Sequence, residues 1–321
     1  MKTRVLAVVG PTASGKSALA IELARRLNGE IICCDSMQIY KQMNIGTAKP
    51  DESELAKAKH HLFDFADPFV SFSCADYIPL AQAAIEDITS RGKLPIFCGG
   101  TGLYIDRLFS GSDFTATEID EGFRRDMEAF ASEFGNEALH GKLKEIDPKS
   151  ADEIHPNNIK RVIRALEIFR TSGRLKSELD AESKSFESPY DTVQIGLCYE
   201  NRELLYNRIN LRVDKMIEAG LLDETRSLLE SGVFEKNSTA AQAIGYKELL
   251  SYFRGEKSLD EATEDLKTAT RRYAKRQMTW FNSHGNVVWL KADGRELSEL
   301  ADEAVVIVKS KLMPCFALLG E

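Results

Sequence analysis

The sequence predicts an α/β fold, in which a parallel sheet is flanked by helices and a helical insertion interrupts the core. Short apolar runs typical of buried parallel strands alternate with segments whose apolar residues recur at helical spacing. Residues 115–186 break this alternation, because they are charged, helix-rich and without a convincing strand. A chain of 321 residues is also long for one compact core, which favours a core with an insertion.

The first strand is expected at residues 5–9, and it runs directly into the octet Gly-Pro-Thr-Ala-Ser-Gly-Lys-Ser at residues 10–17. This octet fits G-x-x-x-x-G-K-[ST], the phosphate-binding loop (P-loop), and residues 18–27 predict a helix after it. Free N–H groups and the helix dipole attract an anion at such a junction. We therefore expect a P-loop NTPase-like core, although the loop alone does not say which phosphate it holds.

The remaining elements follow in order along the chain. Further strands are expected at residues 30–34, 94–98 and 193–198, with a last edge strand at 286–290. Helices are expected at residues 75–90, 202–231, 241–253 and 259–281. The predicted domains are a catalytic core of residues 1–114 and 187–321 and a helical insertion of residues 115–186.

Polar residues follow two of the predicted strands, where ligands bind in α/β folds. Asp35 could ligate Mg²⁺, act as a general base or cap a turn. Thr101 offers a hydroxyl to a phosphate, after two glycines that permit close backbone approach. A kinase would need an acidic residue after an apolar strand, but the strand at 94–98 ends in glycine and Asp64 follows too short an apolar run.

Composition restricts the class of protein. There is no apolar run of membrane-spanning length and no signal-peptide pattern, and the six cysteines form no C-x-x-C pair, so a cytoplasmic protein is expected. The net charge of −8 argues against a basic surface throughout, yet two basic stretches occur. One contains Lys160, Arg161 and Arg164, and the other covers residues 267–281. Each is either a phosphate-backbone contact or a solvated helix face.

Taken together, these stretches resemble the tRNA dimethylallyltransferase (isopentenyltransferase) family. The matching segments are 10–17, 35–40, 44–50, 99–104, 155–157, 160–164, 243–247 and 275–281. The resemblance implies transfer of a dimethylallyl group from dimethylallyl diphosphate to the exocyclic amine of the adenosine 3′ of the anticodon, in the anticodon stem-loop of tRNA. It implies that the P-loop holds the prenyl diphosphate rather than ATP, with Mg²⁺ as cofactor. The chain lacks the zinc finger of eukaryotic members, so a bacterial-type enzyme without a membrane or protein partner is expected.

The resemblance also implies roles for individual residues. Asp35 corresponds to the general base and Thr101 to the residue that positions the reacting centre. The expected diphosphate ligands are Gly10, Thr12, Ala13, Ser14, Gly15, Lys16, Ser17 and Arg212, with Ser17 also holding the metal. The expected tRNA contacts are Asp35, Ser36, Met37, Gln38, Thr101, Arg124, Lys160, Arg161, Val162, Ile163, Arg164, Gly245, Tyr246, Lys247, Lys275 and Arg276. Arg212 could instead be a surface arginine, and Arg208 on the same helix face could compete for its role.

Three alternatives remain at this stage. A small-molecule P-loop kinase leaves the basic stretches unexplained. A prenyltransferase that acts on free AMP shares the P-loop and Asp35 but needs no helical insertion. A non-catalytic RNA-binding protein leaves Asp35, Thr101 and the P-loop without a role.

Overall fold

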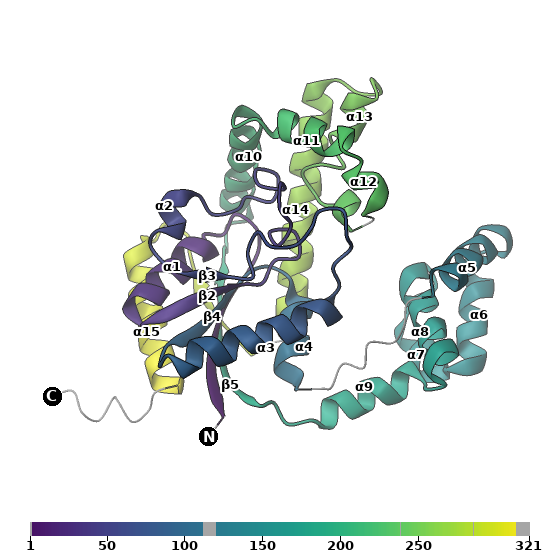
Figure 1. Ribbon diagram of the computed structural model, residues 1–321, viewed down its shortest axis with the longest axis horizontal. Helices are drawn as coiled ribbons and strands as arrows, with labels where there is room; N and C mark the ends of the chain where they lie inside the picture. Colours follow the sequence, from purple (N-terminus) through teal and green to yellow (C-terminus); the bar gives the residue numbers. More distant parts are fainter. Residues whose placement is uncertain (1, 112–119, 238, 285, 313–321) are drawn as a thin grey trace. The chain divides into compact units, whose positions relative to one another are not determined.

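The computed structural model describes residues 2–111, 120–237, 239–284 and 286–312 (Figure 1). The chain divides into two compact units, one formed by Met1–Phe109 with Pro189–Glu321 and the other by Ser110–Ser188. The expected start of the insertion at residue 115 lies outside the described residues. No described helix combines the length and the apolar composition that a membrane span requires.

The larger unit is built on a six-stranded sheet with the strand order β3-β2-β4-β1-β5-β6, in which every neighbouring pair is parallel. Its strands are β1 (Thr3–Val9), β2 (Gly29–Cys33), β3 (His60–His61), β4 (Leu94–Cys98), β5 (Tyr190–Cys198) and β6 (Val287–Lys291). The predicted α/β class with a parallel sheet is confirmed. The two-residue edge strand β3 was not predicted, because its apolar run is too short to give a strand signal.

Helices cover both faces of this sheet (Figure 1). The central strand β1 sends Leu6 and Val8 to a core shared with α1 (Lys16–Arg26) and α15 (Leu297–Leu312). It sends Val5, Ala7 and Val9 to the opposite core, which contains α3 (Cys74–Ser90) and α4 (Gly102–Ser110). All five side chains are fully buried, which explains why this strand is a continuous apolar run. Helix α15 is a further element that the sequence analysis did not include.

The helices after β5 differ from the predicted ones in two places. The observed helices are α10 (Arg202–Glu218), α11 (Leu221–Glu230), α12 (Val233–Lys236), α13 (Leu250–Phe253) and α14 (Leu259–His284). A further short helix, α2 (Glu52–Leu55), lies earlier in the chain. The expected helix at 202–231 is interrupted at Gly220, whose φ is 100°. The helix expected at 241–253 is wrong for most of its length: the segment is a 3₁₀ turn, Ala240–Gln242, then irregular backbone with Gly245 at φ 113°, and only its last four residues form α13. Left-handed backbone of this kind is incompatible with a continuous α-helix.

The smaller unit is helical throughout its described residues. Its helices are α5 (Glu121–Phe134), α6 (Asn136–Ile146), α7 (Pro148–Glu153), α8 (Ile159–Ser172) and α9 (Lys176–Ser185). They pack around Leu139, Leu143, Val162, Ile163 and Leu166, all of which are buried. The apolar residues of α8 recur at helical spacing on one face, so this helix supplies much of the unit's core.

Candidate active site

The P-loop connects β1 to α1 with the strained backbone that its glycines allow. Gly10 has a φ of 135° and Gly15 a φ of 97°, and a Cβ at Gly10 would lie 2.9 Å from the backbone oxygen of Leu197. The hydroxyl of Ser14 is buried and has no hydrogen-bond partner among the described residues. A buried polar group without a partner calls for an explanation, and a bound anion is one that a phosphate-binding loop provides.

Lys16 and Arg212 make the environment of this loop cationic. The Lys16 ammonium donates to the backbone oxygen of Pro11 at 3.3 Å, and Arg212 donates to the hydroxyl of Thr12 at 3.3 Å. Burial lowers the pKa of Lys16, and the charge of Arg212 lowers it further. Burial also lowers the pKa of Arg212. A diphosphate between these two cations would compensate their mutual repulsion.

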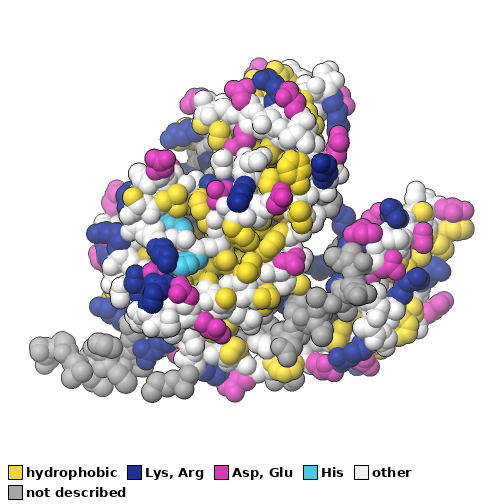
Figure 2. Space-filling view, in the orientation of Figure 1, with side chains coloured by type: hydrophobic (Ala, Val, Ile, Leu, Met, Phe, Trp, Pro, Cys, Tyr) yellow, Lys and Arg dark blue, Asp and Glu magenta, His cyan; other side chains and the backbone are white. Residues whose placement is uncertain are grey.

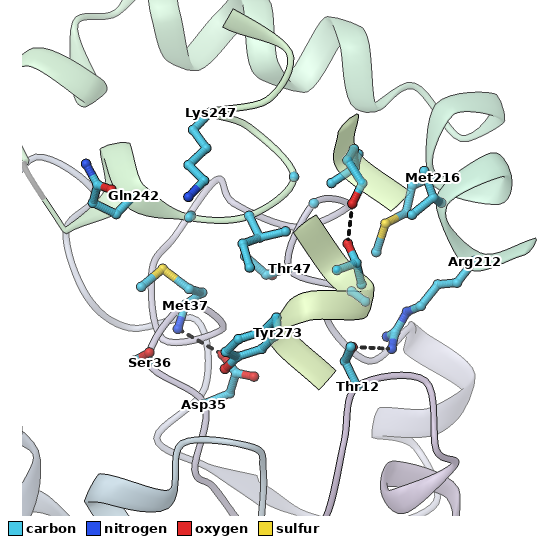
Figure 3. A pocket seen from close by; sticks show the side chains of 18 of the residues that line it. Thr12, Asp35, Ser36, Met37, Thr47, Arg212, Met216, Gln242, Lys247 and Tyr273 are labelled. Atoms are coloured by element: carbon cyan, nitrogen blue, oxygen red, sulfur yellow. Dashed lines mark hydrogen bonds between the residues drawn. The ribbon is translucent and has the colours of Figure 1, made fainter. Parts of the chain in front are cut away.

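Two cavities meet at Arg212. The first has a volume of about 380 Å³ and is lined by Lys16, Ser17, Arg208 and Lys215 as well as Arg212, with Glu54 as its acidic group. The second has a volume of about 240 Å³, and Thr12, Asp35, Ser36, Met37 and Arg212 line it together with residues of α14 and of the irregular segment before α13 (Figure 3). Arg212 points toward Thr12 in this view. Arg212 thus lines both the cavity beside the P-loop and the cavity that contains Asp35.

The second cavity has an amphipathic wall. Its apolar side is formed by Met37, Val213, Met216, Ile244 and Leu266. Its polar side includes Thr47, Gln242, Lys247, Thr270, Tyr273 and Arg276. An apolar surface beside hydroxyl, amide and cationic groups suits a ligand with a short hydrocarbon part and a polar part.

Asp35 and Thr101 come from adjacent strands, since β2 and β4 are neighbours in the sheet. Asp35 Oδ1 accepts the backbone N–H of Met37 at 2.9 Å, which fixes its carboxylate at the cavity edge. The hydroxyl of Thr101 accepts the backbone N–H of Ser36 at 3.0 Å. The turn after β2 and the turn after β4 are therefore joined directly, beside the P-loop that follows the next strand, β1.

The expected tRNA contacts of the larger unit fall into two groups. The side chains of Lys247, Lys275 and Arg276 are exposed, and Lys247 and Arg276 also line the second cavity. Gly245 and Tyr246 are buried, and the Tyr246 hydroxyl donates to Glu224 at 2.7 Å. The Tyr246 side chain therefore belongs to the core, and the expected contact of this residue with tRNA stays a prediction.

Some of the basic residues in the stretch at 267–281 bind other protein side chains and are not free to contact a ligand. Lys267 forms ion pairs with Asp214 at 2.8 Å and with Glu264 at 3.0 Å, and Arg271 donates to Asn210 at 2.6 Å. Lys267 and Arg271 thus join α14 to α10, and Lys267 also pairs with a residue one turn earlier in α14. The exposed cations of this helix are Arg272, Lys275 and Arg276, which have no ion pair among the described residues.

In the smaller unit, the expected contacts on α8 divide by face. Lys160 and Arg161 are exposed, whereas Val162 and Ile163 are buried in the unit's core, so their side chains are not available to tRNA. Glu167, fully buried, accepts hydrogen bonds from Arg124 at 2.8 and 2.9 Å and from Arg164 at 2.5 Å. Arg124 and Arg164 thus compensate a buried carboxylate, which is a structural role whether or not they also contact nucleic acid.

Sequence reasoning missed several residues of this region. Arg208, considered only as a competitor of Arg212, donates to the backbone oxygen of Ala13 in the P-loop at 2.9 Å. Lys215 lines the cationic cavity. Glu224 accepts from three consecutive backbone N–H groups of the loop at residues 44–46, at 2.9 to 3.0 Å. The helical spacing of 208, 212 and 215 could have indicated the first two, but no sequence signal indicates Glu224.

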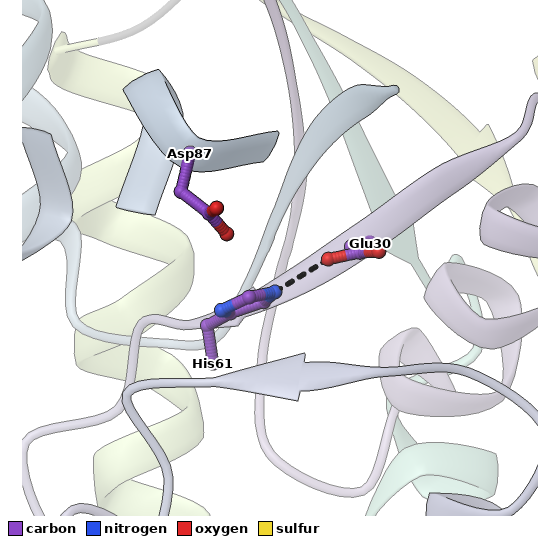
Figure 4. A group of neighbouring side chains, drawn as sticks. All are labelled: Glu30, His61 and Asp87. Carbon is purple, nitrogen blue, oxygen red and sulfur yellow. Dashed lines mark hydrogen bonds and ion pairs between the residues drawn. The ribbon is translucent and has the colours of Figure 1, made fainter. Parts of the chain in front are cut away.

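A separate cluster of possible metal ligands lies at the edge of the sheet and consists of Glu30, His61 and Asp87 (Figure 4). Glu30 is already saturated, because its oxygens accept from Arg91 at 2.5 and 2.7 Å, from Lys93 at 2.7 Å and from His61 at 2.6 Å. Figure 2 shows histidine side chains beside lysine and arginine side chains on the visible face. Hydrogen bonds from Arg91 and Lys93 hold the pKa of Glu30 well below its usual range. Such surroundings disfavour a metal ion.

Two protein-family models match this chain. A model described as IPP transferase matches residues 38–284, and one described as isopentenyl transferase matches residues 3–65. The chain belongs to the IPP transferase family, whose model matches more than half of its length. Among relatives in this family, a tRNA dimethylallyltransferase of Acetivibrio thermocellus is 54% identical over 90% of this chain and 92% of its own length. One of Caldanaerobacter subterraneus is 45% identical over 97% of this chain and 99% of its own length.

Solved structures of this family share the fold over nearly all of this chain. The full-length tRNA isopentenylpyrophosphate transferase of Bacillus halodurans is 44% identical with a TM-score of 0.74, covering 99% of both chains. A eukaryotic dimethylallyltransferase acting on tRNA is 31% identical with a TM-score of 0.82, covering 97% of this chain and 80% of that chain. As an isopentenyl transferase, the chain is a group-transfer enzyme, and the kinase reading is not supported.

Proposed function

We propose that this chain transfers a dimethylallyl group from dimethylallyl diphosphate to the exocyclic amine of an adenosine next to the anticodon in tRNA. The observation that carries this proposal is the pair of cavities that share Arg212. The cationic cavity at the P-loop suits a diphosphate, and the amphipathic cavity has room for a short hydrocarbon chain and a base beside Asp35.

The reaction forms one bond and breaks another at the first carbon of the dimethylallyl group. The adenine amine attacks this carbon, the bond from the carbon to the diphosphate oxygen breaks, and the amine proton passes to the Asp35 carboxylate. Lys16, Arg208 and Arg212 lie where they would stabilise the negative charge that grows on the departing diphosphate. Thr101 would hold the turn that carries Asp35 and Ser36 in register with this centre.

The Ser17 hydroxyl, at the last position of the P-loop, would hold Mg²⁺ together with the oxygens of a bound diphosphate, whose negative charge would offset the cations that line this cavity. When bound, Mg²⁺ would neutralise part of the diphosphate charge. The Glu30 cluster does not supply the metal site, because its carboxylate is saturated by cations.

The adenine must leave its stack in the tRNA loop to reach Asp35, because this carboxylate lies at the edge of a cavity and not on an open surface. The exposed cations of α14, and Lys160 and Arg161 in the smaller unit, are the proposed contacts for tRNA phosphates. Of these cations, free AMP could reach Arg276, which also lines the second cavity, but it would not need the others. A non-catalytic RNA-binding protein would need neither cavity.

Radiolabelled dimethylallyl diphosphate tests this proposal when it is offered with tRNA, with AMP or alone, in the presence of Mg²⁺. We expect label in tRNA only, with release of diphosphate. A parallel reaction with ATP should show no ATP hydrolysis coupled to transfer. Label in AMP but not in tRNA would replace the proposed acceptor, and absence of transfer to either acceptor would refute the proposal.

A further inference from the structure

Gln277 makes an unusual pair of contacts from α14. Its side chain is buried, with 4% of the residue exposed. Its Oε1 accepts the backbone N–H of Thr12 at 2.8 Å, and its Nε2 donates to the backbone oxygen of Gly100 at 3.1 Å. Because one partner is an N–H and the other a carbonyl, only this orientation of the amide satisfies both. A buried amide is stable only when it is hydrogen-bonded in this way.

These two contacts join the loops that carry the proposed chemistry. Thr12 belongs to the P-loop and accepts a hydrogen bond from Arg212. Gly100 directly precedes Thr101, whose hydroxyl holds the backbone of Ser36. A Cβ at Gly100 would lie 1.9 Å from Gln277 Nε2, so the amide occupies the space that a larger residue at this position would need. One side chain therefore links the P-loop to the turn after β4, beyond the backbone pairing that already joins β1 to β4.

The same helix also reaches the second cavity and is anchored beyond it. Tyr273 and Arg276 line that cavity, one turn or less before Gln277. Trp280 follows and donates from Nε1 to Asp106 of α4 at 2.7 Å. Gln277 lies in the sequence between the cavity-lining residues and Trp280. A shift of α14 would therefore move the P-loop and the turn after β4 together.

We propose that Gln277 is a positioning residue, which fixes the diphosphate-binding loop relative to the turn that carries Thr101 and, through it, Asp35. This inference rests on the proposed prenyl transfer. It predicts that loss of the bridge misaligns the two substrates although each still binds. A misplacement of about 1 Å can lower a rate by about 100-fold, so the effect should fall mainly on kcat.

Gln277→Glu is the first test, because a carboxylate can still accept from Thr12 but cannot donate to Gly100. We expect kcat for transfer to tRNA to fall about 10- to 100-fold. The affinity for inorganic pyrophosphate with Mg²⁺, measured by calorimetry, should fall less than kcat, since the contact to the P-loop is kept although the variant adds a negative charge near it. Gln277→Met keeps the side-chain volume but loses both contacts, so it should lower kcat at least as much as Gln277→Glu does, and pyrophosphate affinity much less than kcat.

Asn237→Asp provides a matched control. Asn237 is a fully buried amide, which donates to the backbone oxygens of Pro68 and Val70, both at 3.0 Å, and does not line either cavity. The Asn237→Asp variant also replaces a buried bridging amide by a carboxylate. It should lower thermal stability while leaving kcat within about threefold of wild type. If Gln277→Glu does not fold, Gln277→Met at the same temperature gives the comparison with Asn237→Asp.

A double-mutant cycle with Thr101→Ala separates positioning from a general structural effect. If Gln277 acts through the Thr101 turn, the double variant should lose little more kcat than the worse single variant. Additive losses, or equal kcat values in Gln277→Glu and Asn237→Asp, would overturn the inference. Absence of transfer by the wild-type protein would instead refute the proposed function, so the two failures are distinct.

Discussion

At the scale of single residues, Asp35 is the proposed general base. Its Oδ1 is fixed by the backbone N–H of Met37, and an asparagine could accept the same hydrogen bond. Asp35→Asn should therefore keep the local structure but remove the base, lowering the single-turnover rate of prenyl transfer by about 10²- to 10⁴-fold. Binding of tRNA and of inorganic pyrophosphate should change little. A turnover near that of wild type would exclude Asp35 from proton transfer.

At the scale of elements, the wall of the second cavity depends on a contact between a helix and a loop. Glu224 of α11 accepts from Asn44, Ile45 and Gly46, and Gly46 lines the cavity beside Thr47 and Ala48. Gln38 holds the same loop from another side, donating to the backbone oxygens of Thr47 and Ala48, both at 3.0 Å. The loop is thus held by one side chain that is near it in the sequence, Gln38, and by one that is distant, Glu224.

Glu224→Gln places an amide NH₂ among backbone donors and should weaken this loop. We expect a loss of about 2 kcal/mol in the free energy of unfolding and a higher KM for the substrates, because hydrogen bonds to a charged group are lost. Urea unfolding and steady-state kinetics measure both. Asp223→Asn, at the adjacent and exposed position of α11, is the control and should leave KM unchanged. Equal KM values in the two variants would contradict this account of the loop.

The exposed cations of α14 give a second prediction at this scale. Arg272, Lys275 and Arg276 replaced together by alanine should weaken tRNA binding and leave pyrophosphate binding intact. If each touches a phosphate, the slope of log affinity against log salt should become shallower by about two to three units. Arg271 is kept, because it holds Asn210 of α10. Lys309→Ala with Lys311→Ala on α15, both exposed, is the control. An unchanged affinity and slope in the folded triple variant would make this face an ordinary solvated surface.

At the scale of the whole molecule, Glu30 makes the free energy of unfolding depend on pH. Hydrogen bonds from Arg91, Lys93 and His61 lower its pKa, so the carboxylate is charged in the folded protein where it would already be protonated in the unfolded chain. Its stabilising effect is complete above the ordinary glutamate pKa of about 4.3 and is lost as the pH falls below that value toward the lowered pKa. The free energy of unfolding should therefore decrease as the solution is acidified below about pH 5.

Glu30→Gln should flatten this acid dependence and destabilise the protein at neutral pH, because Arg91 and Lys93 lose their shared counter-ion. Urea unfolding between pH 3 and pH 7, roughly the range over which carboxylates titrate, measures both effects. Asp87→Asn also removes a partner of Arg91, but its side chain is 55% exposed, so it serves as the control with a smaller change. An acid dependence in Glu30→Gln as steep as in wild type would show that other carboxylates dominate.

The sequence by itself determined what depends on neighbouring residues. The run at 5–9, the P-loop and the helix after it are consecutive, so their apolar periodicity and glycines suffice to predict a strand, an anion site and a helix. The family was likewise predictable, because its motifs are local stretches in a fixed order. The roles assigned to Asp35, Thr101 and the P-loop residues remain predictions of chemistry, although the structure brings these residues together.

Only the tertiary structure decided which polar residues face a ligand and which hold the protein together. Arg271 and Arg276 occur in one basic stretch, yet the first binds Asn210 and the second lines a cavity. Gly245 ends the expected helix at 241–253, since its left-handed backbone packs against Gly46 from the distant loop. Gln277 bridges Thr12 and Gly100, which are 265 and 177 positions away. Such contacts leave no periodic trace in the sequence, because their partners are set by the order of strands in the sheet and by the packing of helices on it.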